Sequence, residues 1–66
     1  MMKTAIQIRS ETHARLVRRL LEQNHIAFES RKKTTSAGCV TIFRMTASPE
    51  VIRELLRRHR IPYEAE

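Results

Sequence analysis

Two stretches of the chain, LVRRLLEQNHIAFESR at residues 16–31 and VIRELLRRHRIPYEAE at residues 51–66, resemble each other and decide the fold. They align at a fixed offset of 35 residues. The identical pairs are Arg9 with Arg44, Arg18 with Arg53, Leu20 with Leu55, Leu21 with Leu56, Ile26 with Ile61, and Glu29 with Glu64. We therefore expect one domain over residues 1–66, built from a pseudo-repeat of residues 3–31 and 38–66.

The first half predicts a strand, a helix and a second strand. Residues 4–9 alternate apolar and polar side chains, which is typical of a half-buried strand. Residues 11–24 change to helical spacing, and residues 26–31 alternate again. The expected buried stripe of the helix consists of Leu16, Val17, Leu20 and Leu21.

The ends of this first helix are marked by polar residues. Ser10 or Thr12 can cap its start, and Glu11 lies near the positive end of the helix dipole. Asn24 is a plausible left-handed residue at its end. These signals predict a helix that begins near residue 11 and stops at residue 24.

The second half repeats the strand–helix–strand order. Residues 39–46 are apolar and predict a central strand. Ser48-Pro49-Glu50 predicts a helix start, because serine caps the helix and proline is tolerated at its first position. The expected buried stripe of this helix consists of Val51, Ile52, Leu55 and Leu56.

The remaining segments connect and complete the sheet. Residues 32–38 (KKTTSAG) are polar and include the only glycine, so we expect a hairpin loop there. Residues 61–64 predict a short final strand. Pro62 cannot donate a hydrogen bond to a neighbouring strand, which places this strand at an edge of the sheet.

Two such units in tandem predict an α+β fold of order β-α-β-β-α-β, with a four-stranded antiparallel sheet and two helices on one face. This element order resembles the ferredoxin-like superfold over essentially the whole chain. The motifs of several families with that topology are absent. The paired-cysteine motif of heavy-metal-associated domains is missing, and the predicted central strands lack the aromatic pattern of RNA-recognition motifs.

Composition limits what the domain can do. A chain of 66 residues has a marginal core, and docking on a partner or forming a homodimer would stabilise it. The single cysteine, Cys39, cannot form an internal disulfide, and we expect it to be a small core residue. A lone thiol fits a cytoplasmic location, and we find neither a targeting segment nor a stretch that could span a membrane.

The charge points to an anionic partner. Thirteen lysines and arginines against seven acids give a net charge of +6. This imbalance favours nucleic acid or an acidic protein or nucleoprotein surface. We expect two antiparallel helices side by side to present most of the cations, and the hairpin loop to add three. The candidate partner-binding residues are Arg15, Arg18, Arg19, Arg31, Lys32, Lys33, Arg53, Arg57, Arg58 and Arg60.

No catalytic or metal-binding constellation is evident. His13, His25 and His59 fall in different predicted elements without the spacing of metal ligands. Cys39 has no assignable base beside it, as a nucleophile would require. We therefore expect no enzyme activity, no cofactor and no metal.

Three hypotheses follow. The first is a small non-enzymatic module that contacts nucleic-acid phosphates through its arginine-rich helices and the Lys32-Lys33 loop. The second is a phage- or plasmid-type inhibitor or adaptor, similar to anti-CRISPR proteins, that binds a host nucleoprotein complex. The third is a homodimer that pairs edge strands and carries its charge incidentally.

Overall fold

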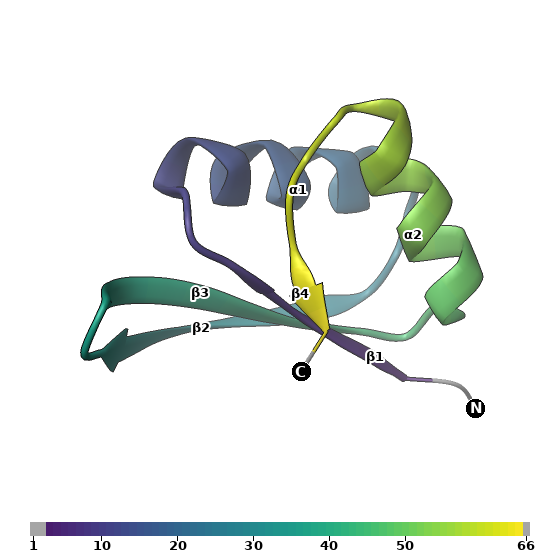
Figure 1. Ribbon diagram of the computed structural model, residues 1–66. Coiled ribbons are helices and arrows are strands. Elements are labelled where there is room, and N and C mark those ends of the chain that lie inside the picture. The colour runs from purple at the N-terminus through teal and green to yellow at the C-terminus, as the bar shows by residue number, and fades with distance from the viewer. Residues whose placement is uncertain (1–2, 66) are drawn as a thin grey trace.

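The computed structural model describes residues 3–65 (Figure 1). Four strands and two helices alternate in the expected order β-α-β-β-α-β. Their bounds are β1 Thr4–Ile8, α1 Glu11–Gln23, β2 Phe28–Thr35, β3 Gly38–Met45, α2 Pro49–Arg58 and β4 Glu64–Ala65.

The four strands form one antiparallel sheet in the order β2-β3-β1-β4. The central strand β3 pairs with β2 on one side, where Phe28 lies opposite Met45, and with β1 on the other, where Ile6 lies opposite Phe43. The two-residue strand β4 pairs with β1 at the edge of the sheet, but it begins only at Glu64, so the expected strand at residues 61–64 is misplaced and Pro62 lies outside it. The prediction of a mixed α+β fold with four antiparallel strands and two helices is confirmed, and the arrangement is compatible with a ferredoxin-like fold.

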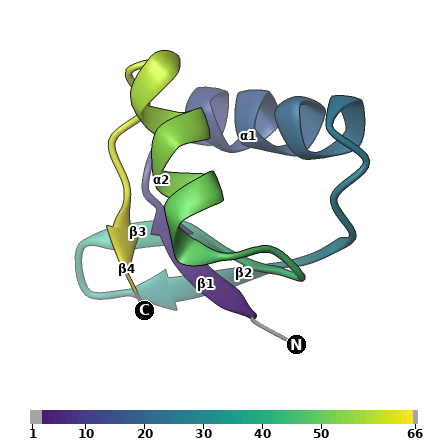
Figure 2. The ribbon, with the colours of Figure 1, turned by 90° about the vertical axis from the view of Figure 1, so that its right-hand side faces the viewer.

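Both helices cover the same face of the sheet and leave the other face open (Figure 1). Figure 2 shows that α2 stands at a steep angle to α1 and does not lie alongside it. The expectation of two antiparallel helices side by side is therefore wrong. The arginines of α1 and α2 do not form one continuous helical surface.

The core fills the space between the sheet and the helices. Phe43 is fully buried at its centre, and its ring lies 6.0 Å from the ring of Phe28. Burial of this apolar surface is the main force that stabilises so small a domain. The other buried core residues are Ile6, Ile8, Ala14, Val17, Leu20, Leu21, Met45, Ile52, Leu56 and Ile61.

The helix starts follow the predicted serine caps. The Ser10 hydroxyl accepts a hydrogen bond from the backbone N–H of His13 at 3.4 Å, and the Ser48 hydroxyl accepts one from Val51 at 3.3 Å. Each bond satisfies one of the free N–H groups in a first helical turn. Of the two expected candidates for α1, Ser10 is therefore the cap.

Both helices end in the same hydrogen-bonded turn, a Schellman motif. The Ile26 N–H donates to the carbonyl of Leu21 at 2.9 Å, and the Ile61 N–H donates to that of Leu56 at 3.0 Å. Such a turn requires a left-handed residue just before the isoleucine. That residue is His25 in the first helix, with φ of 56°, so the assignment of the left-handed position to Asn24 is wrong.

The segment predicted as a hairpin loop is mostly strand. β2 runs to Thr35 and pairs with β3 up to Gly38, so only Ser36 and Ala37 form the turn. The polar residues 32–35 favour a loop in isolation. Pairing with β3 supplies hydrogen-bond partners for their backbone groups and holds them in a strand. The same extension places Cys39 on the projecting part of the hairpin, where it is exposed, so its expected place in the core is wrong.

The buried stripe of α2 is narrower than expected. Ile52 and Leu56 are each 1% exposed, whereas Leu55 is half-buried and Val51 is 52% exposed. A helix packed on a sheet at a steep angle contacts it with only part of its apolar side (Figure 2), and the exposure of Val51 shows that it lies outside that contact.

Candidate nucleic-acid interface

The predicted binding residues occupy three separate places in the structure. A hollow between α1 and β2 collects one group, the open face of the sheet carries a second, and the outer side of α2 carries a third. Arg31 contributes to the first two, because it lies on the edge strand that separates them. Arg19 is exposed on α1 and lines neither hollow.

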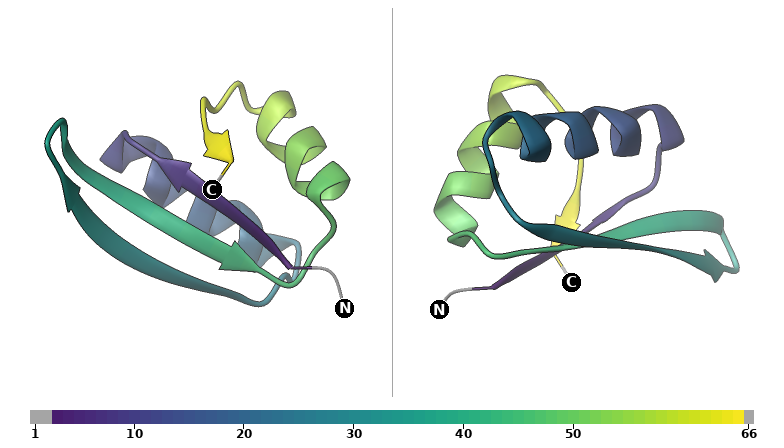
Figure 3. Two further views of the ribbon diagram at one scale, coloured as in Figure 1. Left: turned by 60° about the horizontal axis from the view of Figure 1, so that its bottom comes forward. Right: turned by 180° about the vertical axis from the view of Figure 1, so that it is seen from behind.

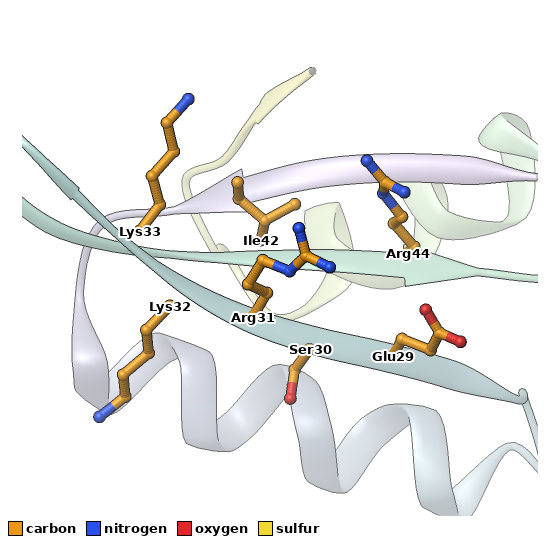
Figure 4. A pocket seen from close by; sticks show the side chains of 7 residues that line it. All are labelled: Glu29, Ser30, Arg31, Lys32, Lys33, Ile42 and Arg44. Atoms are coloured by element: carbon orange, nitrogen blue, oxygen red, sulfur yellow. The ribbon is translucent and has the colours of Figure 1, made fainter.

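The hollow between α1 and β2, which we call the α1–β2 groove, gathers the charges of Arg15, Arg18 and Lys32 around one acid, whereas the side chain of Arg31, which also lines it, points to the open face of the sheet (Figure 4). Its charged lining consists of Glu11, Arg15, Arg18, Arg31 and Lys32. Glu11 is shared between Arg15 and Lys32, with nitrogen–oxygen distances of 3.8 and 3.9 Å. Both contacts are exposed to solvent, where such ion pairs are weak.

Arg18 is held in the groove by a side-chain hydrogen bond across the two elements. Its Nη2 donates to the Ser30 hydroxyl at 3.0 Å. This bond uses one of the five N–H donors of the guanidinium and leaves its charge without an acidic partner within residues 3–65. Arg18 can therefore bind an anion without first breaking an ion pair.

The open face of the sheet carries a second cationic cluster. Arg31, Lys33 and Arg44 project from β2 and β3 to the side opposite α1, around Ile42 (Figure 4). Glu29 lies opposite Arg44 in the strand register but forms no ion pair with it within 4.0 Å. The three cations have no acidic partner among residues 3–65.

Sequence reasoning missed Arg44 and assigned the lysines to a loop. Lys32 points toward the α1 side, whereas Lys33 points to the open face (Figure 4). Adjacent residues alternate in this way only on a strand, so a loop assignment hides the two separate clusters. Every side chain from Glu29 to Thr35 is polar, so no periodic pattern in the sequence marks this stretch as a strand.

The α2 cations form the third group. Arg53, Arg57 and Arg60 line a hollow beside Tyr63. Arg57 and Arg58 both lie near Glu54, at 3.7 and 3.9 Å. This group shares no lining residue with the α1–β2 groove.

All three aromatic side chains belong to the core side of the sheet. Phe43 is buried, and Phe28 and Tyr63 pack against the core. The open sheet face consequently offers no ring on which a base could stack, although stacking is the usual way that single strands are held. The chemistry available in the α1–β2 groove and on the open sheet face is electrostatic contact and hydrogen bonding to anionic oxygens.

Searches against protein-family models, curated proteins and solved structures find no match to this chain. Within residues 3–65, no three histidine, cysteine or acidic side chains are placed to hold a metal ion. In the same range, neither helix is long and apolar enough to cross a membrane. The feature of the described residues that bears most directly on function is the arrangement of cations in three groups.

Proposed function

We propose that the chain is a small non-enzymatic module that binds the phosphates of nucleic acid through its α1–β2 groove. The groove brings Arg15, Arg18 and Lys32 from two elements to one place, with Glu11 as the only acid among the described residues that line it. This excess of cations over acids is the observation that carries the proposal. Arginine side chains favour phosphate because the planar guanidinium can donate two parallel hydrogen bonds.

We also propose that the domain is a member of the ferredoxin-like superfold. The support is that β3 lies between β1 and β2 and antiparallel to both, as split β-α-β units require. In such a fold the edge strand β2 and the start of α1 lie together, which positions the groove. Fold alone does not imply function, so the binding proposal depends on the charges.

The proposal is tested by neutralising the groove. Arg15→Gln/Arg18→Gln removes two groove cations, and Arg53→Gln/Arg57→Gln removes two from α2 as a matched control. We expect the groove variant to weaken binding to a labelled DNA duplex and to reduce the salt slope by about two. The α2 variant should bind nearly as the parent does, apart from the loss of long-range attraction.

The contrary outcomes are informative. If the α2 variant loses binding and the groove variant keeps it, the interface lies on α2. If the parent binds neither DNA nor RNA at low salt, nucleic acid is not the partner. Capture of an acidic protein or nucleoprotein complex by the same cations would then favour the inhibitor or adaptor hypothesis.

A further inference from the structure

The β2–β3 hairpin extends beyond the rest of the sheet. The last pair flanked by β1 is Lys32 with Thr41, because β1 ends at Ile8 opposite Thr41. Beyond this point only two strands remain, and they pair Lys33 with Val40, Thr34 with Cys39 and Thr35 with Gly38. Figures 1 and 3 show this part projecting past both helices and past β1 and β4. We call residues 33–40 the ribbon.

We infer that the ribbon enters the major groove of duplex DNA, an inference that rests on the proposed function and specifies its partner. The major groove is about 12 Å wide and about 8.5 Å deep and admits a two-stranded β-ribbon. Three residue pairs at about 3.3 Å each give the ribbon a reach of about 10 Å, and a sheet with its side chains is about 10 Å thick. Both dimensions fit the groove.

The charges at the base of the ribbon also fit a position in the major groove. Lys32 and Lys33 leave β2 toward opposite faces of the hairpin (Figure 4). Each can therefore approach one of the two phosphate backbones that border the groove. Lys33 has no acidic partner within residues 3–65, and the Lys32–Glu11 contact of 3.9 Å is exposed and weak.

The tip of the ribbon is small and polar. Thr34, Thr35 and Ser36 carry hydroxyl groups, which can donate to phosphate oxygens and can donate to or accept from base edges. The Thr35 hydroxyl already donates to the Gly38 carbonyl at 2.8 Å and accepts from the Ala37 N–H at 3.2 Å, which holds the turn in shape. No bulky side chain at the turn blocks entry into a groove.

The aromatic residues argue against a single strand as the preferred partner. Phe28, Phe43 and Tyr63 all lie in or against the core, so neither the ribbon nor the open sheet face provides a stacking platform. Single-strand binding proteins gain much of their affinity from such stacking. A duplex requires only phosphate contacts and a groove of suitable width.

The natural cysteine makes this inference directly testable. Cys39 is the only cysteine of the chain and is exposed on the ribbon. Its alkylation by iodoacetamide, a neutral reagent, is measured by mass spectrometry with and without a saturating DNA duplex. Insertion of the ribbon should slow alkylation several-fold. A control with Val51→Cys in a Cys39→Ser background places the thiol on α2, where the rate should not change.

A second measurement tests the ribbon independently of the thiol, because bound DNA could slow the alkylation of Cys39 without insertion of the ribbon. Lys33→Glu should weaken duplex binding and reduce its salt slope by about one, whereas Arg53→Glu should change the slope less. If duplex binds, as fluorescence anisotropy reports, but Cys39 reacts at its free rate, the ribbon is not inserted and the inference is overturned while the proposed function stands. A clear preference for single strands would also overturn it. Absence of binding to any nucleic acid at low salt overturns both.

Discussion

His25 and Arg60 adopt the same left-handed backbone conformation, with φ angles of 56° and 52°, at positions 35 residues apart in the chain. Each follows the end of a helix and precedes an isoleucine that closes the Schellman motif. The pseudo-repeat of the sequence therefore corresponds to a repeated turn in the structure. The two halves share the turn that directs the chain from helix back toward the sheet.

Glycine at either left-handed position should stabilise the protein. A residue with a Cβ atom is strained by about 1–2 kcal/mol in this conformation, and the greater freedom of glycine in the unfolded chain offsets part of the gain. We expect His25→Gly and Arg60→Gly each to raise the free energy of unfolding by up to about 1 kcal/mol, as measured by urea denaturation.

The matched controls lie two residues earlier in each helix. Gln23→Gly and Arg58→Gly place glycine at the last residue of each helix, where the backbone is still right-handed, and should lower the free energy of unfolding by up to about 0.5–1 kcal/mol, the cost of glycine in the middle of a helix. Loss of stability in the variants at residues 25 and 60 would show that these positions are not left-handed in solution.

The packing of α2 should depend on Leu56 far more than on Val51. Leu56 is 1% exposed, so Leu56→Ala should cost about 2–5 kcal/mol, enough to unfold much of so small a domain. Val51→Ala, at a position 52% exposed, should change stability by less than about 0.5 kcal/mol. Far-ultraviolet circular dichroism during urea titration measures both. Equal losses would mean that α2 packs through a different side.

The cap of α2 should contribute measurably to stability. Ser48→Ala removes the acceptor of the Val51 N–H, and we expect a loss of about 1 kcal/mol in the free energy of unfolding. Ser48→Asp keeps an acceptor and should retain most of the stability. If alanine and aspartate behave alike, the 3.3 Å hydrogen bond is not a significant interaction in solution.

The free edge of β2 should resist self-association. If two copies paired antiparallel about Lys32, that residue would face its own copy, and Arg31 would face Lys33 of the other chain. Lysines on an edge strand commonly prevent such pairing. We therefore expect a monomeric mass by light scattering at low salt, and a greater tendency to associate in Lys32→Thr. A stable dimer of the parent protein through β2 would contradict this expectation and favour the homodimer hypothesis.

Local signals in the sequence predicted both helices well, because caps and helical spacing act within a few residues. Ser48 and Pro49 mark the start of α2 in the sequence and in the structure. β2 was predicted poorly, because Lys32 and Lys33 favour a loop locally and are held in a strand only by pairing with β3. The exposure of Cys39 follows from the same long-range pairing.

The candidate site was only partly predictable for a related reason. Composition alone indicated a basic surface, and the helical pattern placed Arg15 and Arg18 on the exposed side of α1. Their meeting with Lys32 depends on the packing of α1 over the sheet edge. The angle between the helices, which separates these cations from the α2 group, is likewise set by tertiary packing (Figure 2).

The central claim is that the groove cations neutralise nucleic-acid phosphates, and the salt dependence of duplex binding tests it most directly. Three groove cations, with Lys33 of the ribbon as a fourth, predict a slope of about −2.7 to −3.6 when log Kobs is plotted against log salt concentration. The plot should be linear and should flatten by about two in Arg15→Gln/Arg18→Gln. Absence of binding at low salt, or a slope near zero, would contradict the claim.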